Sequence, residues 1–174
     1  MNAVLFTARL RLVPMTLAVV EAAFDGDRSR IESLLDARVP EAWPGRALVE
    51  RAFCASLDDI RRAPEQRLWG DRVMITREGA LVGSVIFHGR PDDGVAEVGY
   101  GVEERFQKQG FATEGTRACV DWALAQEGIR SVTATTPPWH ASSIRVLEQS
   151  GLARVGTEGH EMLGEVLRFE RRRV

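Results

Sequence analysis

Several residue types are scarce in this 174-residue chain. Its two cysteines, Cys54 and Cys119, are too few for a disulfide framework or a four-ligand zinc site of their own. Lys108 is the single lysine and Asn2 the single asparagine, so arginine supplies nearly all of the positive charge. No apolar run approaches the ~20 residues of a membrane helix, and the first ten residues lack the order of a secretion signal. We therefore expect a cytoplasmic protein with reduced cysteines.

The charges are nearly balanced, with a formal net charge of -2. Nucleic acids and membrane surfaces both select proteins with an excess of Lys and Arg, so neither is an expected partner. The run 171–173 is expected to be a solvated tail. His88 and His160 have no partner at metal-ligand spacing, and no metal is expected.

The order of the predicted elements is that of an α+β domain, and without a repeat or linker residues 1–174 are expected to form one domain. Periodicity predicts helices that start after the N-cap Thr16 and over about 28–37, 47–62, 110–126 and 139–150, where Gly151 forms the C-terminal cap. It predicts strands over 8–13, 67–76, 81–87, 95–102, 131–136, 152–157 and 161–170. The strands between 67 and 102 form an antiparallel meander, and Trp43 and Trp69 are expected to be packing residues.

The stretch 97–114 carries the strongest chemical signal. It predicts a strand, a short polar loop and the start of a helix, where free backbone amides and the helix dipole favour an anion such as a diphosphate. Gly110 and Ala112 allow close approach of the backbone, and Lys108 adds a positive charge. The alternative is a solvent-exposed connection in which the glycine serves only the turn.

Three blocks of sequence resemble one enzyme family. Residues 107–112 are similar to the Q/R-x-x-G-x-G/A pyrophosphate motif of the GCN5-related N-acetyltransferase (GNAT) superfamily. The run FQKQGFATEG (106–115) resembles the YRGKGYATEA form of the ribosomal-protein-alanine N-acetyltransferase-like branch. HASSIRVLEQSGL (140–152) resembles that branch's NxASIRVLEKLGF, and TARLRL (7–12) resembles its N-terminal TERLxLR strand.

The resemblance implies the GNAT fold, in which a mostly antiparallel sheet flanked by helices is splayed between strands 95–102 and 131–136. Acetyl-CoA would enter that V-shaped gap. Its pantetheine would pair with the backbone of residues 100–102, and its diphosphate would meet the amides of 107–112. The implied cofactor contacts are Tyr100, Gly101, Val102, Gln107, Lys108, Gln109, Gly110, Phe111, Ala112, Thr113, His140 and Ser143.

Two positions depart from the superfamily pattern. His140 stands where the motif usually has Asn, and Leu147 stands where many members have the Tyr that protonates the departing thiolate. His140, Ser143 and Leu147 share one helical stripe, which makes Ser143 the candidate hydroxyl near the sulfur. The alternative is that Ser143 bonds the preceding helical turn. A thiol is already a tolerable leaving group near neutral pH, so loss of the tyrosine need not disable catalysis.

Glu97 is the candidate general base. Strand alternation places it on the same face as Gly99 and Gly101, which leave space beside its carboxylate for an acceptor ammonium. The alternative is a cross-strand pair with Arg72 or Arg90.

The resemblance thus predicts transfer of an acetyl group from acetyl-CoA to a primary amine, either a protein N-terminus or a small molecule, by direct attack in a ternary complex. The acceptor site is sought in region 16–62. A non-catalytic acyl-CoA-binding module of the same fold is the alternative that His140 and Leu147 motivate. An exposed edge strand near the C-terminus would allow a homodimer.

Overall fold

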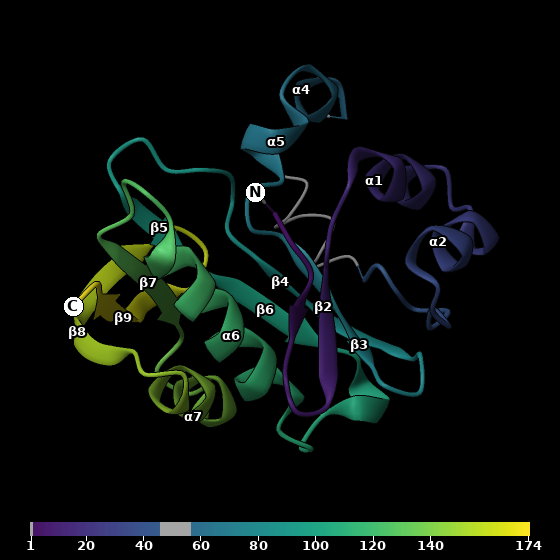
Figure 1. The fold of residues 1–174 in the computed structure, drawn as a ribbon. Coiled ribbons are helices and arrows are strands. Elements are labelled where there is room, and N and C mark those ends of the chain that lie inside the picture. Colours follow the sequence, from purple (N-terminus) through teal and green to yellow (C-terminus); the bar gives the residue numbers. More distant parts are fainter. Residues whose placement is uncertain (1, 46–56) are drawn as a thin grey trace.

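The computed structural model describes residues 2–45 and 57–174. Its first half contains two short strands, four helices and a hairpin (Figure 1): β1 (Leu5–Phe6), β2 (Leu10–Pro14), α1 (Leu17–Phe24), α2 (Arg28–Leu35), α4 (Leu57–Arg62), α5 (Pro64–Arg67), β3 (Arg72–Thr76) and β4 (Leu81–Ile86). Its second half contains β5 (Val95–Glu97), β6 (Gly99–Val102), the 3-10 turn η1 (Glu104–Phe106), α6 (Phe111–Ala125), β7 (Ser131–Thr136), α7 (Ala141–Gln149), β8 (Ala153–His160) and β9 (Gly164–Arg172). The predicted α+β class is confirmed.

The strands form two sheets that part at Val98. One sheet has the order β1-β2-β3-β4-β6 and the other β5-β7-β9-β8. β5 pairs in parallel with β7, and the Val98 amide still donates to the Thr133 carbonyl at 2.9 Å. β6 then pairs with β4 instead. The expected single strand over 95–102 is therefore wrong, because each half belongs to a different sheet. Their divergence forms the V-shaped gap that the resemblance implies.

Helices cover the two faces of the first sheet with separate hydrophobic clusters. Met74 faces α6 and packs with Cys119 and Val120, while Val73 and Ile75 on either side of it pack with residues of α1 and α2. This alternation follows from the period of two in a strand covered on both faces. Gly115 lets α6 approach closely, because a Cβ there would lie 2.3 Å from the Met74 sulfur.

Several predicted boundaries move for local reasons. Pro64 occupies the first turn of α5, so β3 begins at Arg72, and Trp69 lies in the intervening turn, packed at 5.1 Å from the Trp122 ring. β2 begins at Leu10 rather than at residue 8, because Thr7 to Arg9 form the turn after β1. The N-cap is confirmed at Thr16, whose hydroxyl accepts the Val19 amide.

Of the C-terminal arginines, Arg171 and Arg172 belong to β9 instead of a solvated tail, and the exposed Arg173 follows the strand. Arg171 lies in β9 and pairs with Asp121 at 2.7 Å, and Arg173 donates to the Gln126 carbonyl. Cys119 is buried as expected. Cys54 and most of the helix predicted over 47–62 lie outside the described residues, and the remainder forms α4. Within the described ranges no helix is long and apolar enough to cross a membrane.

A buried polar group lies beneath β3. The Asp71 carboxyl accepts the Phe87 amide at 2.8 Å through one oxygen, and the other oxygen has no hydrogen-bond partner among the described residues. Burial raises the pKa of Asp71 to about 7, although the Phe87 amide and the Arg72 charge act in the opposite direction. The Arg72 guanidinium donates to the Gly70 and Ala3 carbonyls and lies 4.2 Å from the Trp122 ring.

The raised pKa of Asp71 predicts a loss of stability with rising pH. Between the ordinary value of 3.8 and about 7 the folded state holds a proton that the unfolded state has released. The free energy of unfolding should therefore fall by up to about 1.4 kcal/mol per pH unit in that window. Asp71→Asn should abolish this slope in denaturant titrations, whereas the exposed control Asp92→Asn should retain it. An unchanged slope in Asp71→Asn would contradict this account.

Candidate active site

The strand β6 presents different chemistry on its two faces. Ala96, Val98, Tyr100 and Val102 lie in or against the cluster under α6. The alternating residues Glu97, Gly99 and Gly101 lie on the opposite face, where Ile86 of β4 contacts the position of a Cβ on Gly99. In the described part of the chain, β6 hydrogen-bonds to β4 as its only partner strand. The other edge of β6 pairs with no described strand and faces the gap between the two sheets.

A row of unpaired amides follows β6. From Lys108 to Thr113, no backbone N–H donates to another described residue, because this run covers a tight loop and the first turn of α6. Gly110 is the N-cap with φ 85, a conformation that favours glycine, and it has no side chain to occupy the amides. The helix dipole adds positive potential at the same place. The run can hold a diphosphate, and the residues present therefore fit the acetyl-CoA that the resemblance implies.

The side chains of this loop offer fewer contacts to a ligand than its backbone does. The Gln107 amide group donates to the Val102 carbonyl at 3.0 Å, which ties the loop to the end of β6. Lys108 has φ 61 and is exposed. The Phe111 ring is buried under the Arg9 guanidinium, 4.5 Å from its centroid, so Phe111 can offer a ligand only its backbone. The Thr113 hydroxyl donates to Gln149 of α7 at 3.3 Å.

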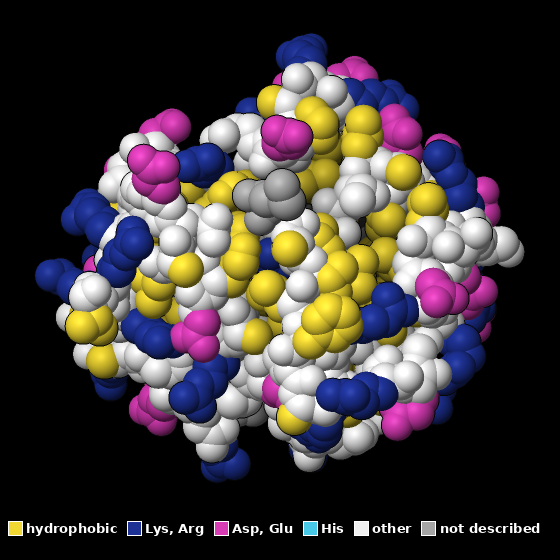
Figure 2. All heavy atoms as spheres, viewed as in Figure 1, with side chains coloured by type: hydrophobic (Ala, Val, Ile, Leu, Met, Phe, Trp, Pro, Cys, Tyr) yellow, Lys and Arg dark blue, Asp and Glu magenta, His cyan; other side chains and the backbone are white. Residues whose placement is uncertain are grey.

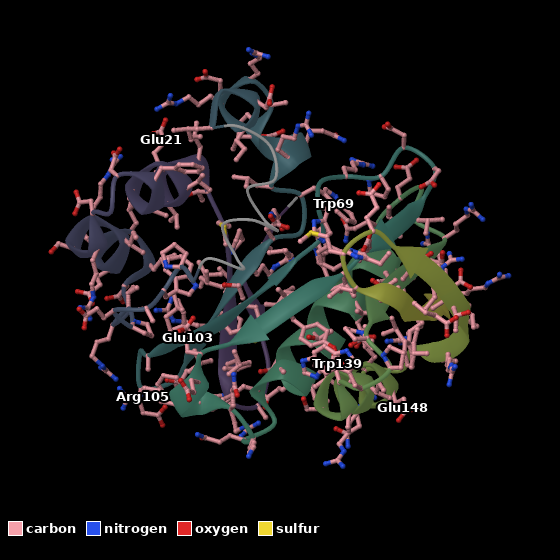
Figure 3. The ribbon with its side chains drawn as sticks, turned by 180° about the vertical axis from the view of Figure 1, so that it is seen from behind. Glu21, Trp69, Glu103, Arg105, Trp139 and Glu148 are labelled. Carbon is pink, nitrogen blue, oxygen red and sulfur yellow. The ribbon has the colours of Figure 1, made fainter. Side chains whose placement is uncertain are left out.

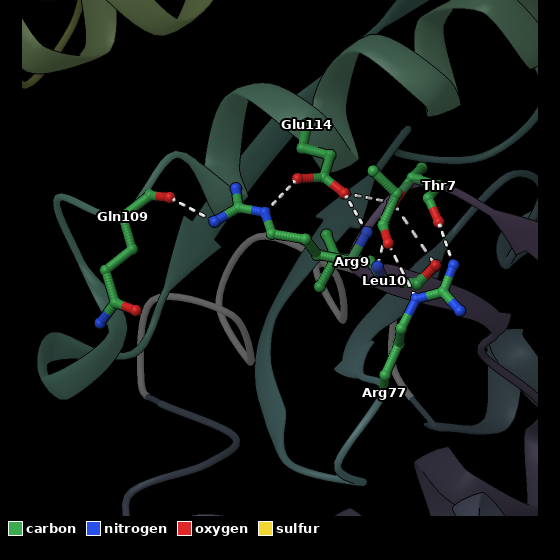
Figure 4. A network of polar contacts seen from close by, with 7 residues as sticks. Thr7, Arg9, Leu10, Arg77, Gln109 and Glu114 are labelled. Carbon is green, nitrogen blue, oxygen red and sulfur yellow. Dashed lines mark hydrogen bonds and ion pairs between the residues drawn. The ribbon is translucent and has the colours of Figure 1, made fainter.

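Glu114 anchors the start of α6 to the N-terminal hairpin (Figure 4). Its carboxylate accepts the Thr7 hydroxyl at 2.6 Å, the Arg9 amide at 2.8 Å and the Arg9 Nε at 2.7 Å. Arg9 also donates to the Gln109 carbonyl at 2.8 Å. Partial burial acts to raise the pKa of Glu114, but the bonds from Thr7 and Arg9 outweigh it, and the pKa lies below its usual range. Arg9 thus neutralises the one carboxylate in the first turn of α6.

His140 serves as the N-cap of α7. Its Nδ1 accepts the Ser143 amide at 3.3 Å and lies 3.1 Å from the Ser142 hydroxyl. The ring stacks on Trp139, with an interplanar angle of 11°. The family motif usually has Asn at this position, and Asn is a strong N-cap residue. His140 performs the same capping function in this chain. When Nδ1 accepts, Nε2 carries the proton and is left as the donor for a ligand.

Ser143 and Tyr100 meet across the gap between α7 and β6. Their hydroxyl oxygens are 2.8 Å apart, and the Tyr100 hydroxyl also lies 3.1 Å from the Ser143 carbonyl. The alternative in which Ser143 bonds the preceding turn is therefore not what the structure shows. Leu147, one turn further along the stripe, is fully buried in the core. The structure brings Tyr100 and Ser143 together, a pairing that the sequence analysis did not predict.

Glu97 is exposed at the end of β5, where the two sheets part. The cross-strand alternatives do not form, because Arg72 is buried beside Trp122 and Arg90 donates to the Glu127 carbonyl. On the same face, the Trp43 indole donates to Ser84 at 3.2 Å, and Ser84 is paired with Gly101. Trp43 is buried, as expected for a packing residue, and it forms part of the floor beside β6.

The histidines outside α7 have structural positions. His88 follows β4 with φ 55, and His160 at the end of β8 accepts the amides of Met162 and Leu163. Across 2–45 and 57–174, no three His, Cys, Asp or Glu side chains gather in a way that could hold a metal ion.

Arg9 and Glu114 are the site residues that sequence reasoning missed. Both belong to quoted blocks, Arg9 to TARLRL and Glu114 to FATEG, but they are 105 residues apart. The available signal was that the two residues carry opposite charges in two blocks that both match the family. Only the fold shows that the two side chains are in contact.

The structure thus combines a mixed sheet that parts at Val98 with an open strand edge and a helix N-terminus whose amides are free among the described residues. The model of the acetyltransferase (GNAT) domain matches residues 9–153, and the chain belongs to that family. It is accordingly an acyltransferase of the N-acetyltransferase type.

Relatives agree with this family. The chain is 24% identical over 147 residues to the N-acetyltransferase YjdG of Bacillus subtilis, covering 83% of this chain and 86% of YjdG. Its fold is similar to that of the ribosomal-protein-S5-alanine acetyltransferase from Vibrio fischeri, with a TM-score of 0.64, 15% identity and coverage of 99% and 97%. It is equally similar to RimL, the ribosomal L7/L12 alpha-N-protein acetyltransferase solved with coenzyme A, with a TM-score of 0.64, 15% identity and coverage of 98% of each chain.

The Glu114 anchor predicts a loss of stability that depends on pH. Glu114→Ala leaves the Arg9 and Thr7 donors without their acceptor, so the free energy of unfolding should fall by about 1–3 kcal/mol near neutral pH. Because the folded pKa is lowered, this difference from the wild type should be full above about pH 5 and shrink as pH falls through the ordinary glutamate value of about 4.3 and below. Denaturant titrations at several pH values measure it.

Glu148→Ala is the matched control, since Glu148 is an exposed carboxylate on the neighbouring helix α7. It should change stability by less than about 0.5 kcal/mol. An equal loss in both variants, or a difference that does not change with pH, would contradict the anchoring role of Glu114.

Proposed function

We propose that the protein transfers an acetyl group from acetyl-CoA to a primary amine by direct attack in a ternary complex. One observation carries the proposal: the open edge of β6 continues into the row of free amides from Lys108 to Thr113. A pantetheine can extend along a strand edge by backbone hydrogen bonds, while a diphosphate binds at a helix N-terminus. The family and the coenzyme A in the RimL structure support this donor.

Acetyl-CoA, when bound, supplies a thioester that is activated for attack. The chain would hold its diphosphate with the amides of 108–113 and its pantetheine with the backbone of 100–102. His140 Nε2–H offers one further donor at the start of α7. These contacts position one reactant, and proximity to the second reactant supplies much of the rate enhancement.

Glu97 is proposed to take the proton of the acceptor amine. Its carboxylate is exposed at the point where the sheets part, and a Cβ on Gly101 would meet no atom within 4 Å, although Ile86 and His88 lie beside Gly99. An acceptor approaching on this face meets the carboxylate before it reaches the strand edge. A neutral amine is required for attack, so a base at this position is useful whichever amine is bound.

The Tyr100–Ser143 pair is proposed to assist the departing thiolate from the other face. The two hydroxyls are 2.8 Å apart, and Tyr100 follows Glu97 by three residues with its side chain on the opposite face. Tyr100 of β6 would thereby protonate the departing thiolate, the role that many members assign to a tyrosine at the position of Leu147 in α7. Acid and base then act on different sides of one strand and do not neutralise each other.

The nature of the acceptor is less constrained than that of the donor. In region 16–62, Asp58 and Asp59 pair with Arg61 and Arg62, so these carboxylates do not single out a basic acceptor. The proposed acceptor class is therefore a primary amine, either at a protein N-terminus or in a small molecule.

Turnover with a panel of primary amines and N-terminal peptides tests the function. Release of free CoA thiol should depend on both acetyl-CoA and the amine. Glu97→Gln should lower kcat/KM by about 10²–10⁴ while leaving CoA affinity unchanged. The loss should be largest for amines of high pKa and shrink for amines that are already neutral at the assay pH.

The exposed carboxylate of Glu158 on β8 provides the control, and Glu158→Gln should keep full activity. CoA binding without turnover of any amine would favour the non-catalytic binding module instead. A loss in Glu97→Gln that is the same for all amines would reject Glu97 as the base.

The hydroxyl pair predicts coupled effects of two substitutions. Tyr100→Phe and Ser143→Ala should each lower kcat, by about tenfold or less, because a thiol of pKa ~8.5 leaves without much help. The double variant should be little worse than the worse single variant, since both act through one hydrogen bond. Single-turnover rates on saturated enzyme measure this, and additive losses would contradict a shared role.

A further inference from the structure

A pocket lies beside the site described above. Its volume is about 640 Å³, within the range of small-molecule sites. Four segments line it: the β1–β2 turn at Arg9, α2 and the loop after it, the β3–β4 turn, and the stretch from Arg105 to Phe111. All of its lining residues except Gln109 and Phe111 lie outside the set expected to contact acetyl-CoA.

The pocket is built from arginine. Arg9, Arg28, Arg38, Arg77 and Arg105 line it, against a single carboxylate at Glu78. The whole chain has a formal net charge of -2, so this concentration of positive charge is local. We call this cavity the arginine pocket.

Most of these charges lack an acidic partner. Arg9 pairs with Glu114, and Arg28 lies 3.6 Å from Glu32. The Arg77 guanidinium donates to the Ala8 and Thr7 carbonyls, which fixes its direction without neutralising it.

Arg38 and Arg105 make even fewer polar contacts. Within the described ranges, neither guanidinium has a hydrogen bond or an ion pair, and Arg105 only lies over the Phe106 ring, 5.0 Å from its centroid. Arg38, Arg77 and Arg105 place three positive charges around one cavity, and their mutual repulsion costs free energy. A bound anion would offset that cost.

The arginine pocket and the proposed acetyl-CoA site share Gln109 and Phe111 but extend from them to different parts of the fold. The acetyl-CoA site is formed between β6, the start of α6, and α7. The pocket is formed on the side of α2 and the β3–β4 turn. Figure 3 shows Arg105 at the lower left, well apart from Trp139 and Glu148, which lie beside and in α7. Figure 2 views the molecule from the side opposite to that of Figure 3. On that side, basic and acidic side chains lie mainly around the edge, and hydrophobic side chains lie in the centre.

We propose that the arginine pocket binds a small polyphosphate anion while acetyl-CoA occupies its own site. Guanidinium groups match phosphate oxygens with two parallel hydrogen bonds, and several guanidiniums around one cavity suit a chain of phosphates rather than a single one. Phe106 on the wall, with the Arg105 guanidinium over its ring, adds apolar surface beside these charges. The ligand chemistry is thus a polyphosphate, free or as part of a nucleotide.

Calorimetric titration of CoA-saturated protein with inorganic tripolyphosphate, and separately with ATP, tests the proposal. We expect one site whose affinity falls as salt rises. Arg38→Gln combined with Arg105→Gln should weaken binding at least tenfold, and the fold should tolerate both because the two side chains are exposed and unpaired among the described residues. Tighter binding of ATP would indicate a nucleotide and equal binding the phosphate chain alone, and both results support the proposal.

Arg154→Gln removes an exposed arginine of β8, away from the pocket, and should leave the affinity unchanged. Three results would overturn the proposal: no binding to CoA-saturated protein, wild-type binding by the double variant, or equal weakening by Arg154→Gln. A failure of acetyl-CoA to bind would appear in its own titration and would not mimic any of these, because the double variant leaves the amides of 108–113 in place.

Discussion

The ion pair between Arg9 and Glu114 is the constraint on which the rest of the site depends. The start of α6, the proposed diphosphate site, carries a glutamate in its first turn, which by itself would repel an anion. Arg9 removes that repulsion, and its second branch holds the Gln109 carbonyl, so the loop amides are left unoccupied. Because the Arg9 guanidinium also covers Phe111, one side chain sets the charge, the loop conformation and the packing at the start of α6.

The parting of the sheets at Val98 provides the second requirement, an open strand edge with two usable faces. In a continuous sheet, β7 would pair along the whole of 95–102 and occupy the groups that a pantetheine needs. Here β5 keeps that pairing and β6 gives it up. The alternation along the strand then places Glu97 and Tyr100 on opposite faces, as the proposed roles in proton removal and proton delivery require.

Local chemistry in the sequence predicted much of this fold. Short sequence patterns predict the N-cap at Thr16 and the helix that begins at Gly110, and the structure confirms both. The break at Val98 was not predictable from the strand itself, because its residues alternate without interruption and only pairing with two different partners divides it. The Tyr100–Ser143 contact and the Arg9–Glu114 pair also escaped prediction, since each joins positions more than forty residues apart. Pattern and spacing describe neighbours along the chain, whereas these contacts are set by how α6 and α7 pack on the sheets.

The sequence distance spanned by the Glu114 anchor has a consequence for the order in which the protein assembles. Its bonds to Thr7 and Arg9 join residues 107 and 105 positions apart, so most of the intervening chain must be in place before they form. Contacts of this range contribute to slow folding, because the entropy of closing a long loop is lost before the contact can compensate. The amide row is therefore expected to be completed late, after the N-terminal hairpin has docked on α6. Ligand binding at that row would then report on the integrity of the whole fold and not only on the loop that makes the contact.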